Sequence, residues 1–121
     1  TSLRIASVSG ERSADAAVLC APDFALAEGE ILVGAEIAVQ PAVHWTYRRA
    51  TTNGGAFLCA VAGTRSSDGA NLFLAGGANH PLHLVGARDV PPLRSDALAS
   101  GAYRRRLVSV LAEEAVAEIA A

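Results

Sequence analysis

The fold is decided by one stretch of the chain, which consists of Phe57-Leu58-Cys59-Ala60-Val61-Ala62, a polar turn at Ser66-Ser67-Asp68-Gly69, and Leu72-Phe73-Leu74. A short, almost wholly apolar run of this kind is typical of a strand that is buried on both faces. The turn residues predict a hairpin that leads back into a partner strand. No helix fits between the two runs, so the stretch predicts antiparallel pairing rather than a crossover unit.

Upstream of this hairpin, three further segments have the pattern of strands. Residues 3–8 alternate apolar and polar side chains and then reach a turn at Ser9-Gly10. Residues 31–39 alternate most clearly, and Pro41 is expected to end that strand. Residues 44–49 form another predicted strand, in which Trp45, Tyr47 and Arg49 share one face. These segments extend the predicted antiparallel sheet.

Downstream of the hairpin, the pattern changes from strand to helix. Residues 82–85 predict a short edge strand, and Val90-Pro91-Pro92 predicts an extended linker. From about Ser100 the spacing is helical, with Ser95 or Ser100 as the expected N-terminal cap. The apolar face expected for this helix consists of Tyr103, Leu107, Val110, Leu111 and Ile119. The sequence therefore predicts an α+β fold, in which a three- to four-stranded antiparallel sheet packs against a C-terminal helix, as a single domain over residues 1–121.

The composition narrows the classes of function. A 121-residue chain that is 51% hydrophobic can form one packed core, and its net charge of −2 does not provide the basic surface of a nucleic-acid binder. No apolar run is long enough to predict a membrane helix, and the N-terminus does not resemble a signal peptide, so we expect a cytoplasmic protein. Cys20 and Cys59 form neither a disulfide framework nor a metal-binding pattern, and we expect both to be reduced, buried thiols.

Five segments, in order along the chain, resemble the C-terminal domain of the FAD-carrying medium subunit of the molybdenum hydroxylases, the family of xanthine dehydrogenase and CO dehydrogenase. Residues 28–33 (Glu-Gly-Glu-Ile-Leu-Val) are similar to the "pGEli" strand that opens that domain, and Tyr47 with the basic pair after it is similar to "aYeK". Residues 56–62 and 68–81 resemble the central hairpin that runs into "lGGvaprP", and residues 100–107 (Ser-Gly-Ala-Tyr-Arg-Arg-Arg-Leu) resemble "sa.YRr.l". The resemblance implies that residues 1–26 correspond to the end of the preceding FAD domain and residues 27–121 to the C-terminal domain.

Two departures from the family pattern limit what the resemblance implies. The family's Gly-rich FAD pyrophosphate loops belong to the upstream domain, and Gly54-Gly55 and Gly76-Gly77 are no substitute because neither leads from a strand directly into a helix. We therefore expect no cofactor held by this chain alone, and FAD only where an upstream or partner FAD domain is present. The one or two helices that the family places between "GGvaprP" and "YRr" are also missing. We therefore expect the sheet face that they would cover to be covered by a companion, which could be a ligand, a second copy of the chain or the missing flavin half.

The candidate ligand-binding residues lie on the strand over residues 44–49. In the family the start of this domain lies beside the flavin ring, and the resemblance implies that position for Tyr47. Trp45 could stack on a flat ring and Arg49 could pair with an anionic group, whereas the alternative is that the aromatic side chains only anchor the core. His44 beside Tyr47 is a possible general acid. His44, His80 and His83 have no carboxylate spacing that supports a metal site, so no metal is expected.

The terminal helix carries its charges in the unfavourable order for the helix dipole, with cations in the first turn and anions toward the end. We interpret these residues either as a solvated face or as charges that meet partners on the sheet or on another subunit, such as an antiparallel copy of the helix. The candidate interface residues are Arg104, Arg105, Arg106, Glu113, Glu114 and Glu118.

Three functions remain open, and whether the chain is an enzyme is not decided. The first is the C-terminal domain of a molybdenum-hydroxylase FAD subunit, which supports flavin and contacts iron–sulfur and molybdenum subunits without chemistry of its own. The second is a free-standing descendant that binds or converts a small molecule, for example in a biosynthetic pathway. The third is a dimeric structural module.

Overall fold

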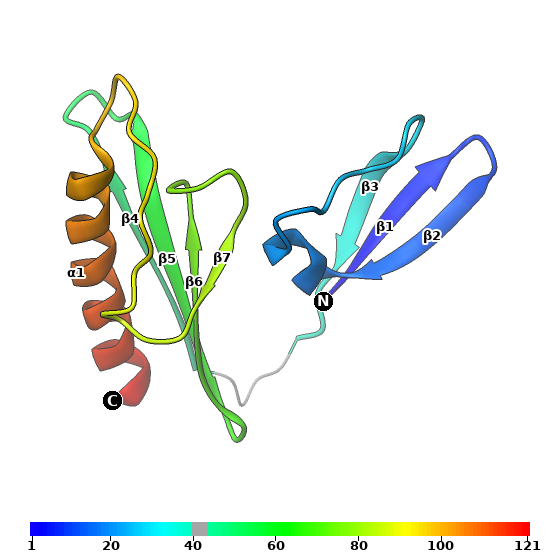
Figure 1. Cartoon of the computed structure of the whole chain (residues 1–121). Helices are drawn as coiled ribbons and strands as arrows, with labels where there is room; N and C mark the ends of the chain where they lie inside the picture. The colour runs from blue at the N-terminus through cyan, green and yellow to red at the C-terminus, as the bar shows by residue number, and fades with distance from the viewer. Residues whose placement is uncertain (40–43) are drawn as a thin grey trace. The chain divides into compact units, whose positions relative to one another are not determined.

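The computed structural model describes residues 1–39 and 44–121 (Figure 1). The chain divides into two compact units, Thr1–Pro41 and Ala42–Ala121, each with its own antiparallel sheet. Pro41, the expected end of a strand, lies outside the described residues. Two sheets, of three and four strands, together with a C-terminal helix confirm the α+β class.

The N-terminal unit is a three-stranded sheet in the order β2-β1-β3. Its elements are β1 (Ser2–Ser7), β2 (Gly10–Asp15), the 3-10 helix η1 (Ala16–Cys20) and β3 (Ile31–Glu36). The strand and the turn predicted at Ser9-Gly10 are confirmed, and the turn joins β1 to β2, which pair from Ser2–Asp15 to Ser7–Gly10. Within this unit only Leu3 and Ile5 are fully buried hydrophobic side chains, so its core is small.

β3 differs from the sequence prediction in its length, surroundings and sheet. It ends at Glu36 rather than continuing to Val39, and the side chains of Ile31, Leu32 and Val33 are exposed on both faces. It pairs with β1, so this strand, expected to open the C-terminal domain, belongs to the N-terminal unit. β3 thus lies in the first of the two compact units, whereas the resemblance groups it with the residues that follow.

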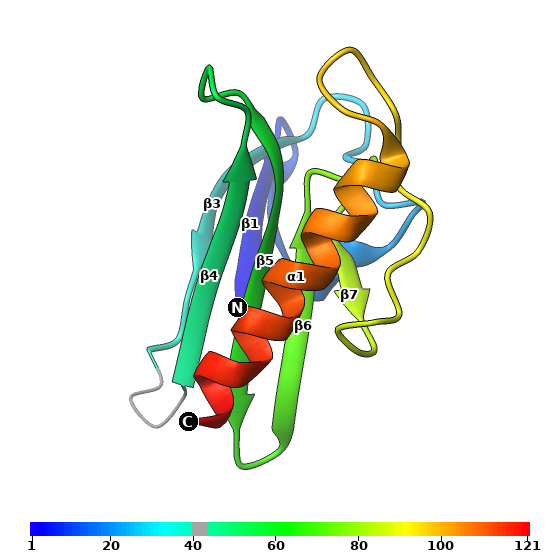
Figure 2. The ribbon, with the colours of Figure 1, turned by 90° about the vertical axis from the view of Figure 1, so that its left-hand side faces the viewer.

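The C-terminal unit is a four-stranded antiparallel sheet in the order β4-β5-β6-β7, covered on one face by α1 (Figures 1 and 2). Its elements are β4 (His44–Thr51), β5 (Phe57–Ser66), β6 (Gly69–Ala75), β7 (Leu82–Leu84) and α1 (Gly101–Ala120). The hairpin predicted between β5 and β6 is confirmed, with Ser66 opposite Gly69. The edge strand and the helix are confirmed as well.

The buried face of α1 is not the one that the sequence predicted. The buried side chains are Arg104, Val108, Ala112, Ala115 and Ile119, together with Gly101. Of the expected face only Ile119 is fully buried, whereas Tyr103 and Val110 are about half exposed at 51% and 53%. The sequence prediction assigned the large apolar side chains to the buried face. The structure instead uses small alanines, which let the helix approach the sheet closely.

Gly63 on β5 shows how close this approach is. A β-carbon at Gly63 would lie 3.2 Å from Thr46 Cγ2, 3.3 Å from Leu72 Cδ2 and 3.4 Å from Ile119 Cδ1. The absent side chain leaves room for Ile119 above the centre of the sheet. The helix position therefore depends on a glycine in the middle of the buried strand.

The segment between β7 and α1 covers the remaining part of the helix-side face (Figure 2). Val90 is 1% exposed and belongs to the core with Leu84 and Val108, and Ala87 and Leu93 pack against this core. On the helix-side face, Val90 from this chain therefore provides part of the cover, whereas Trp45 and Tyr47 on the opposite face stay exposed. Of the extended linker at residues 90–92, Val90 is the residue that enters the core.

Candidate functional site

The two faces of the β4-β5-β6-β7 sheet have different surroundings. On β4, Thr46 Oγ1 and Arg48 Nη2 both donate to Glu118 Oε2 of α1, so these side chains lie on the helix face. Strand alternation then places Trp45, Tyr47 and Arg49 on the opposite face. The shared face predicted for these three residues is thus observed, and it points away from the helix. We call this surface the outer face; it is formed by Trp45, Tyr47, Arg49, Asn71, Phe73 and His83.

The centre of the outer face is a row of side chains that crosses all four strands. Tyr47 pairs with Ala62, Ala62 with Phe73, and Phe73 with His83. Trp45 is 73% exposed, Tyr47 54% and Phe73 38%. The expectation that Trp45 and Tyr47 anchor the core is therefore not supported, since most or half of each side chain is accessible. Aromatic rings on an exposed sheet can stack against a flat group.

His83 is held in place on this face. Its ring lies 5.0 Å from the ring of Phe73, and its Nε2 donates to Asn71 Oδ1 at 3.1 Å. The sequence analysis did not select Phe73, His83 or Asn71 as site residues. Alternation along β6 would place Phe73 and Asn71 on one face, but only the strand register shows that this is also the face of Tyr47.

His44 lies apart from Tyr47. Alternate residues of a strand share a face, so His44 lies on the helix side of the sheet with Thr46 and Arg48. It pairs with Arg65 of β5. A general-acid role beside Tyr47 is not possible in this arrangement. Residues three positions apart in a strand point to opposite faces, so His44 does not lie beside Tyr47.

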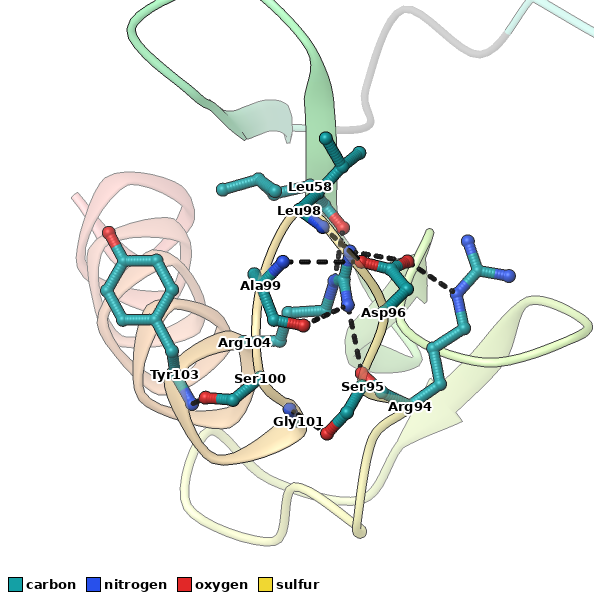
Figure 3. Close-up of polar contacts among 10 residues, drawn as sticks. All are labelled: Leu58, Arg94, Ser95, Asp96, Leu98, Ala99, Ser100, Gly101, Tyr103 and Arg104. Atoms are coloured by element: carbon teal, nitrogen blue, oxygen red, sulfur yellow. Dashed lines mark hydrogen bonds and ion pairs between the residues drawn. The ribbon is translucent and has the colours of Figure 1, made fainter.

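Arg104 has the most extensive polar contacts of the candidate interface residues (Figure 3). It is 1% exposed and donates to the carbonyl oxygens of Leu58, Arg94 and Ala99 and to both carboxylate oxygens of Asp96 at 2.9 and 3.0 Å. A buried guanidinium is tolerated when its donors are paired in this way. Arg104 thus joins the start of α1 to the loop before it and to the start of β5.

The remaining charges on α1 are divided between partners in the chain and solvent. Arg105 Nε donates to the Val90 carbonyl oxygen at 2.7 Å, and Glu113 accepts from Arg88 at 3.3 Å. Glu118 meets Thr46 and Arg48 on the sheet. Arg106 and Glu114 are exposed and make no hydrogen bond or ion pair with the described residues. The interpretation that these charges meet partners on the sheet therefore applies to Glu118 and, through the Leu58 carbonyl oxygen, to Arg104.

In the C-terminal unit, polar contacts shift the pKa values of Asp96 and Glu118. Hydrogen bonds from Arg104, and then from the Leu98 and Ala99 amides, lower the pKa of Asp96 below its ordinary value of 3.8. Hydrogen bonds from Thr46 and then Arg48 lower the pKa of Glu118 below its ordinary value of 4.5. Burial raises the pKa of the Cys59 thiol, which disfavours a nucleophilic thiolate as the sequence predicted. Cys20 is only half-buried.

The described residues do not fit the pyrophosphate of FAD. The first amides of α1 are already bonded, Gly101 N to Ser95 Oγ and Tyr103 N to Ser100 Oγ, so both predicted capping serines act at this end. The other helix of the described residues is η1, which is capped by Asp15. The Asp15 carboxylate accepts from Ala17 N and would repel a phosphate. Neither helix start in residues 1–39 and 44–121 provides the free amides of a phosphate cradle.

No group of three or more His, Cys, Asp or Glu side chains within the described ranges could hold a metal ion. No helix there is long and apolar enough to cross a membrane.

Several solved structures share this fold. The chain matches quinoline 2-oxidoreductase from Pseudomonas putida 86 (22% identity, TM-score 0.77), reconstituted CO dehydrogenase from Oligotropha carboxidovorans (22%, 0.76) and CO dehydrogenase from Hydrogenophaga pseudoflava (13%, 0.76). Each match covers 98% of this chain and 52% of the other. The chain has the same fold as the matched half of these chains. The resemblance found in the sequence is thereby confirmed at the level of fold.

The chain spans about half the length of the solved chains that it matches. No protein-family model and no curated protein sequence matches it. The shared fold extends over both units, because 98% of the chain is covered. The N-terminal sheet is therefore part of the same match.

Proposed function

We propose that this chain is the C-terminal part of a flavin-carrying subunit of a molybdenum hydroxylase, with a supporting role and no chemistry of its own. The observation that carries the proposal is the fold match over both units, which covers 98% of this chain but half of the larger chains. The part of the larger chains that this chain does not cover would have to supply the FAD site. The chain itself then holds no FAD, since its described helix starts lack free amides for a pyrophosphate.

The outer face is the surface that we assign to this supporting role. Trp45, Tyr47 and Phe73 are exposed there, while Ala62 between them is small, so a flat group or a partner surface can approach the sheet. Arg49 adds a positive charge at the same face. Burying such aromatic side chains against a partner stabilises a complex by a few kcal/mol each at best. The partners that we propose are the FAD domain and the iron–sulfur and molybdenum subunits, in the cytoplasm.

The test is isolation of the complex from the native cells through a tag on this chain. The purified complex is expected to contain FAD, iron and molybdenum in amounts proportional to the chain, measured by absorbance and elemental analysis. The same chain produced alone is expected to be colourless after incubation with FAD and dialysis. A chain that leaves native cells without flavin or metals, or that retains FAD alone, contradicts the proposal.

Variants of the outer face sharpen this test. Trp45→Ala combined with Tyr47→Ala is expected to reduce the co-isolated FAD at least about tenfold, as expected for the loss of aromatic contacts at an interface. Tyr103→Ala is the matched control, since Tyr103 is an aromatic residue of similar exposure on α1, away from the outer face. Equal losses in both variants would show that the outer face has no special part in assembly.

A further inference from the structure

A shallow depression on the solvent side of α1 gathers three arginines. It is lined by Arg88, Ala102, Arg105, Arg106, Ser109 and Val110. Residues 102, 105, 106, 109 and 110 lie three to four positions apart on one face of the helix, and Arg88 approaches from the segment after β7. This surface belongs to the helix layer, so it is separate from the outer face and independent of the function proposed above.

The arginines of the depression differ in how they are held. Arg105 Nε donates to Val90 O at 2.7 Å, which fixes the guanidinium and leaves its two terminal nitrogens for another acceptor. Arg106 has no partner among the described residues. Arg88 donates to Glu113 at 3.3 Å with 90% of its side chain exposed, so this ion pair is weak.

The charges around the depression do not balance. Arg88, Arg105 and Arg106 contribute three positive charges, and Glu113 contributes one negative charge, which leaves an excess of two. The Ser109 hydroxyl can add one hydrogen bond, and Ala102 and Val110 provide apolar contact beside the charges. Guanidinium groups pair with tetrahedral oxyanions through two parallel hydrogen bonds, which makes arginine the preferred partner of phosphate.

We propose that this depression binds a phosphate group, with Arg105 and Arg106 as the principal donors, Arg88 as a third and Ser109 as a hydrogen-bonding partner. The ligand is a dianionic phosphate, either the free anion or the phosphate of a small ester. Glu113 weakens the binding of phosphate, because its carboxylate competes for Arg88. The site uses side chains only, so it differs from the amide cradle that the helix starts lack.

The experiment titrates the full chain with inorganic phosphate at constant ionic strength and follows the arginine Nε–H signals by NMR. We expect saturable shifts for Arg88, Arg105 and Arg106 with a Kd on the order of 1 mM, and no such shifts with chloride. Glycerol 3-phosphate binding at least as tightly assigns the site to a phosphate ester. Exclusion of glycerol 3-phosphate assigns it to the free anion.

Three variants test the assignment of residues. Arg106→Gln is expected to weaken phosphate binding about fivefold, and Glu113→Gln to strengthen it about twofold, as for charges at an exposed site. Arg4→Gln is the control, because it removes the same charge from an exposed arginine of the N-terminal unit and should change the Kd less than twofold. Equal weakening by Arg4→Gln, or shifts produced by an acidic peptide and not by phosphate, would overturn the proposal.

Discussion

Arg104 shows at the scale of one residue how a charge can be part of a core. Five hydrogen bonds to three carbonyl oxygens and one carboxylate satisfy a side chain that is 1% exposed. The contacts converge from β5, from the loop that includes Arg94 and Asp96, and from Ala99 (Figure 3). The planar guanidinium is the one side chain that can reach all of these acceptors at once.

Arg104→Lys is expected to destabilise the C-terminal unit by about 2–4 kcal/mol, because a lysine ammonium has fewer donors and cannot reach every acceptor. The measurement is urea unfolding followed by the helical circular dichroism of α1. Arg106→Lys is the matched control, since Arg106 is the exposed arginine two positions on, and it should change the free energy of unfolding by less than about 0.5 kcal/mol. Equal effects of both changes would mean that the buried contacts contribute little.

Gly63 gives a second prediction at the residue scale. Gly63→Ala is expected to cost about 1–3 kcal/mol, because the added methyl group would press on Thr46, Leu72 and Ile119. Gly54→Ala is the control in the same unit, because the nearest atom to its added β-carbon is 3.8 Å away, an ordinary contact. Unfolding curves that coincide for Gly63→Ala and the unmodified chain would show that the helix can shift without cost.

At the scale of elements, α1 is held to β4 by Glu118. Its carboxylate accepts from Thr46 and Arg48, and these contacts lower its pKa from the ordinary value of 4.5. The lowered pKa in the folded chain means that the contact adds stability above the pKa of the unfolded state. This stability is lost as the pH falls through the folded-state pKa, and Asp96 acts in the same direction.

The urea midpoint of α1 is therefore expected to fall as the pH is lowered from 5 to 3. Glu118→Gln should lower the midpoint at pH 7, and its difference from the unmodified chain should shrink as the pH falls through the lowered pKa of Glu118, where the carboxylate becomes protonated. Glu114→Gln is the control on the same helix, since Glu114 has no partner among the described residues. A gap between Glu118→Gln and the unmodified chain that stays constant with pH would contradict this account.

The element scale also shows how far the sequence could predict the site. Alternation in β4 correctly placed Trp45, Tyr47 and Arg49 on one face, because the side-chain direction in a strand is a local property. Phe73 and His83 could not be assigned to that face, since their position beside Tyr47 depends on the register of three strand pairs. The buried stripe of α1 was missed because alanines and an arginine, rather than the largest apolar side chains, face the sheet.

At the scale of the whole molecule, the two units bury very different cores. The cluster formed by Leu58, Val61, Leu74 and Val108 with its neighbours lies wholly in the C-terminal unit, whereas the N-terminal unit buries Leu3 and Ile5. Small sheets with few buried side chains are marginally stable by themselves. We therefore expect the C-terminal unit to be stable by itself and the N-terminal unit not to be.

A fragment of residues 44–121 is expected to unfold cooperatively with the helical signal of α1 intact, and a fragment of residues 1–39 to remain unfolded by itself. The measurements are circular dichroism and one-dimensional NMR dispersion of each fragment. Comparison with the full chain under the same conditions supplies the reference. Dispersed signals from the isolated N-terminal fragment would show that Leu3 and Ile5 suffice.

The sequence by itself determined the local elements of this protein: the β5-β6 hairpin, the edge strand β7, the capping serines of α1 and the α+β class. Each of these depends on side chains within a few residues of one another, through alternation, turn geometry or capping. Only the tertiary structure decided that β3 pairs with β1, that Arg104 enters the core, that Val90 of the linker packs on the sheet, and that Phe73 and His83 lie beside Tyr47. These outcomes depend on strand register and on the rotation of the helix about its axis, which are set by packing between residues far apart in the chain.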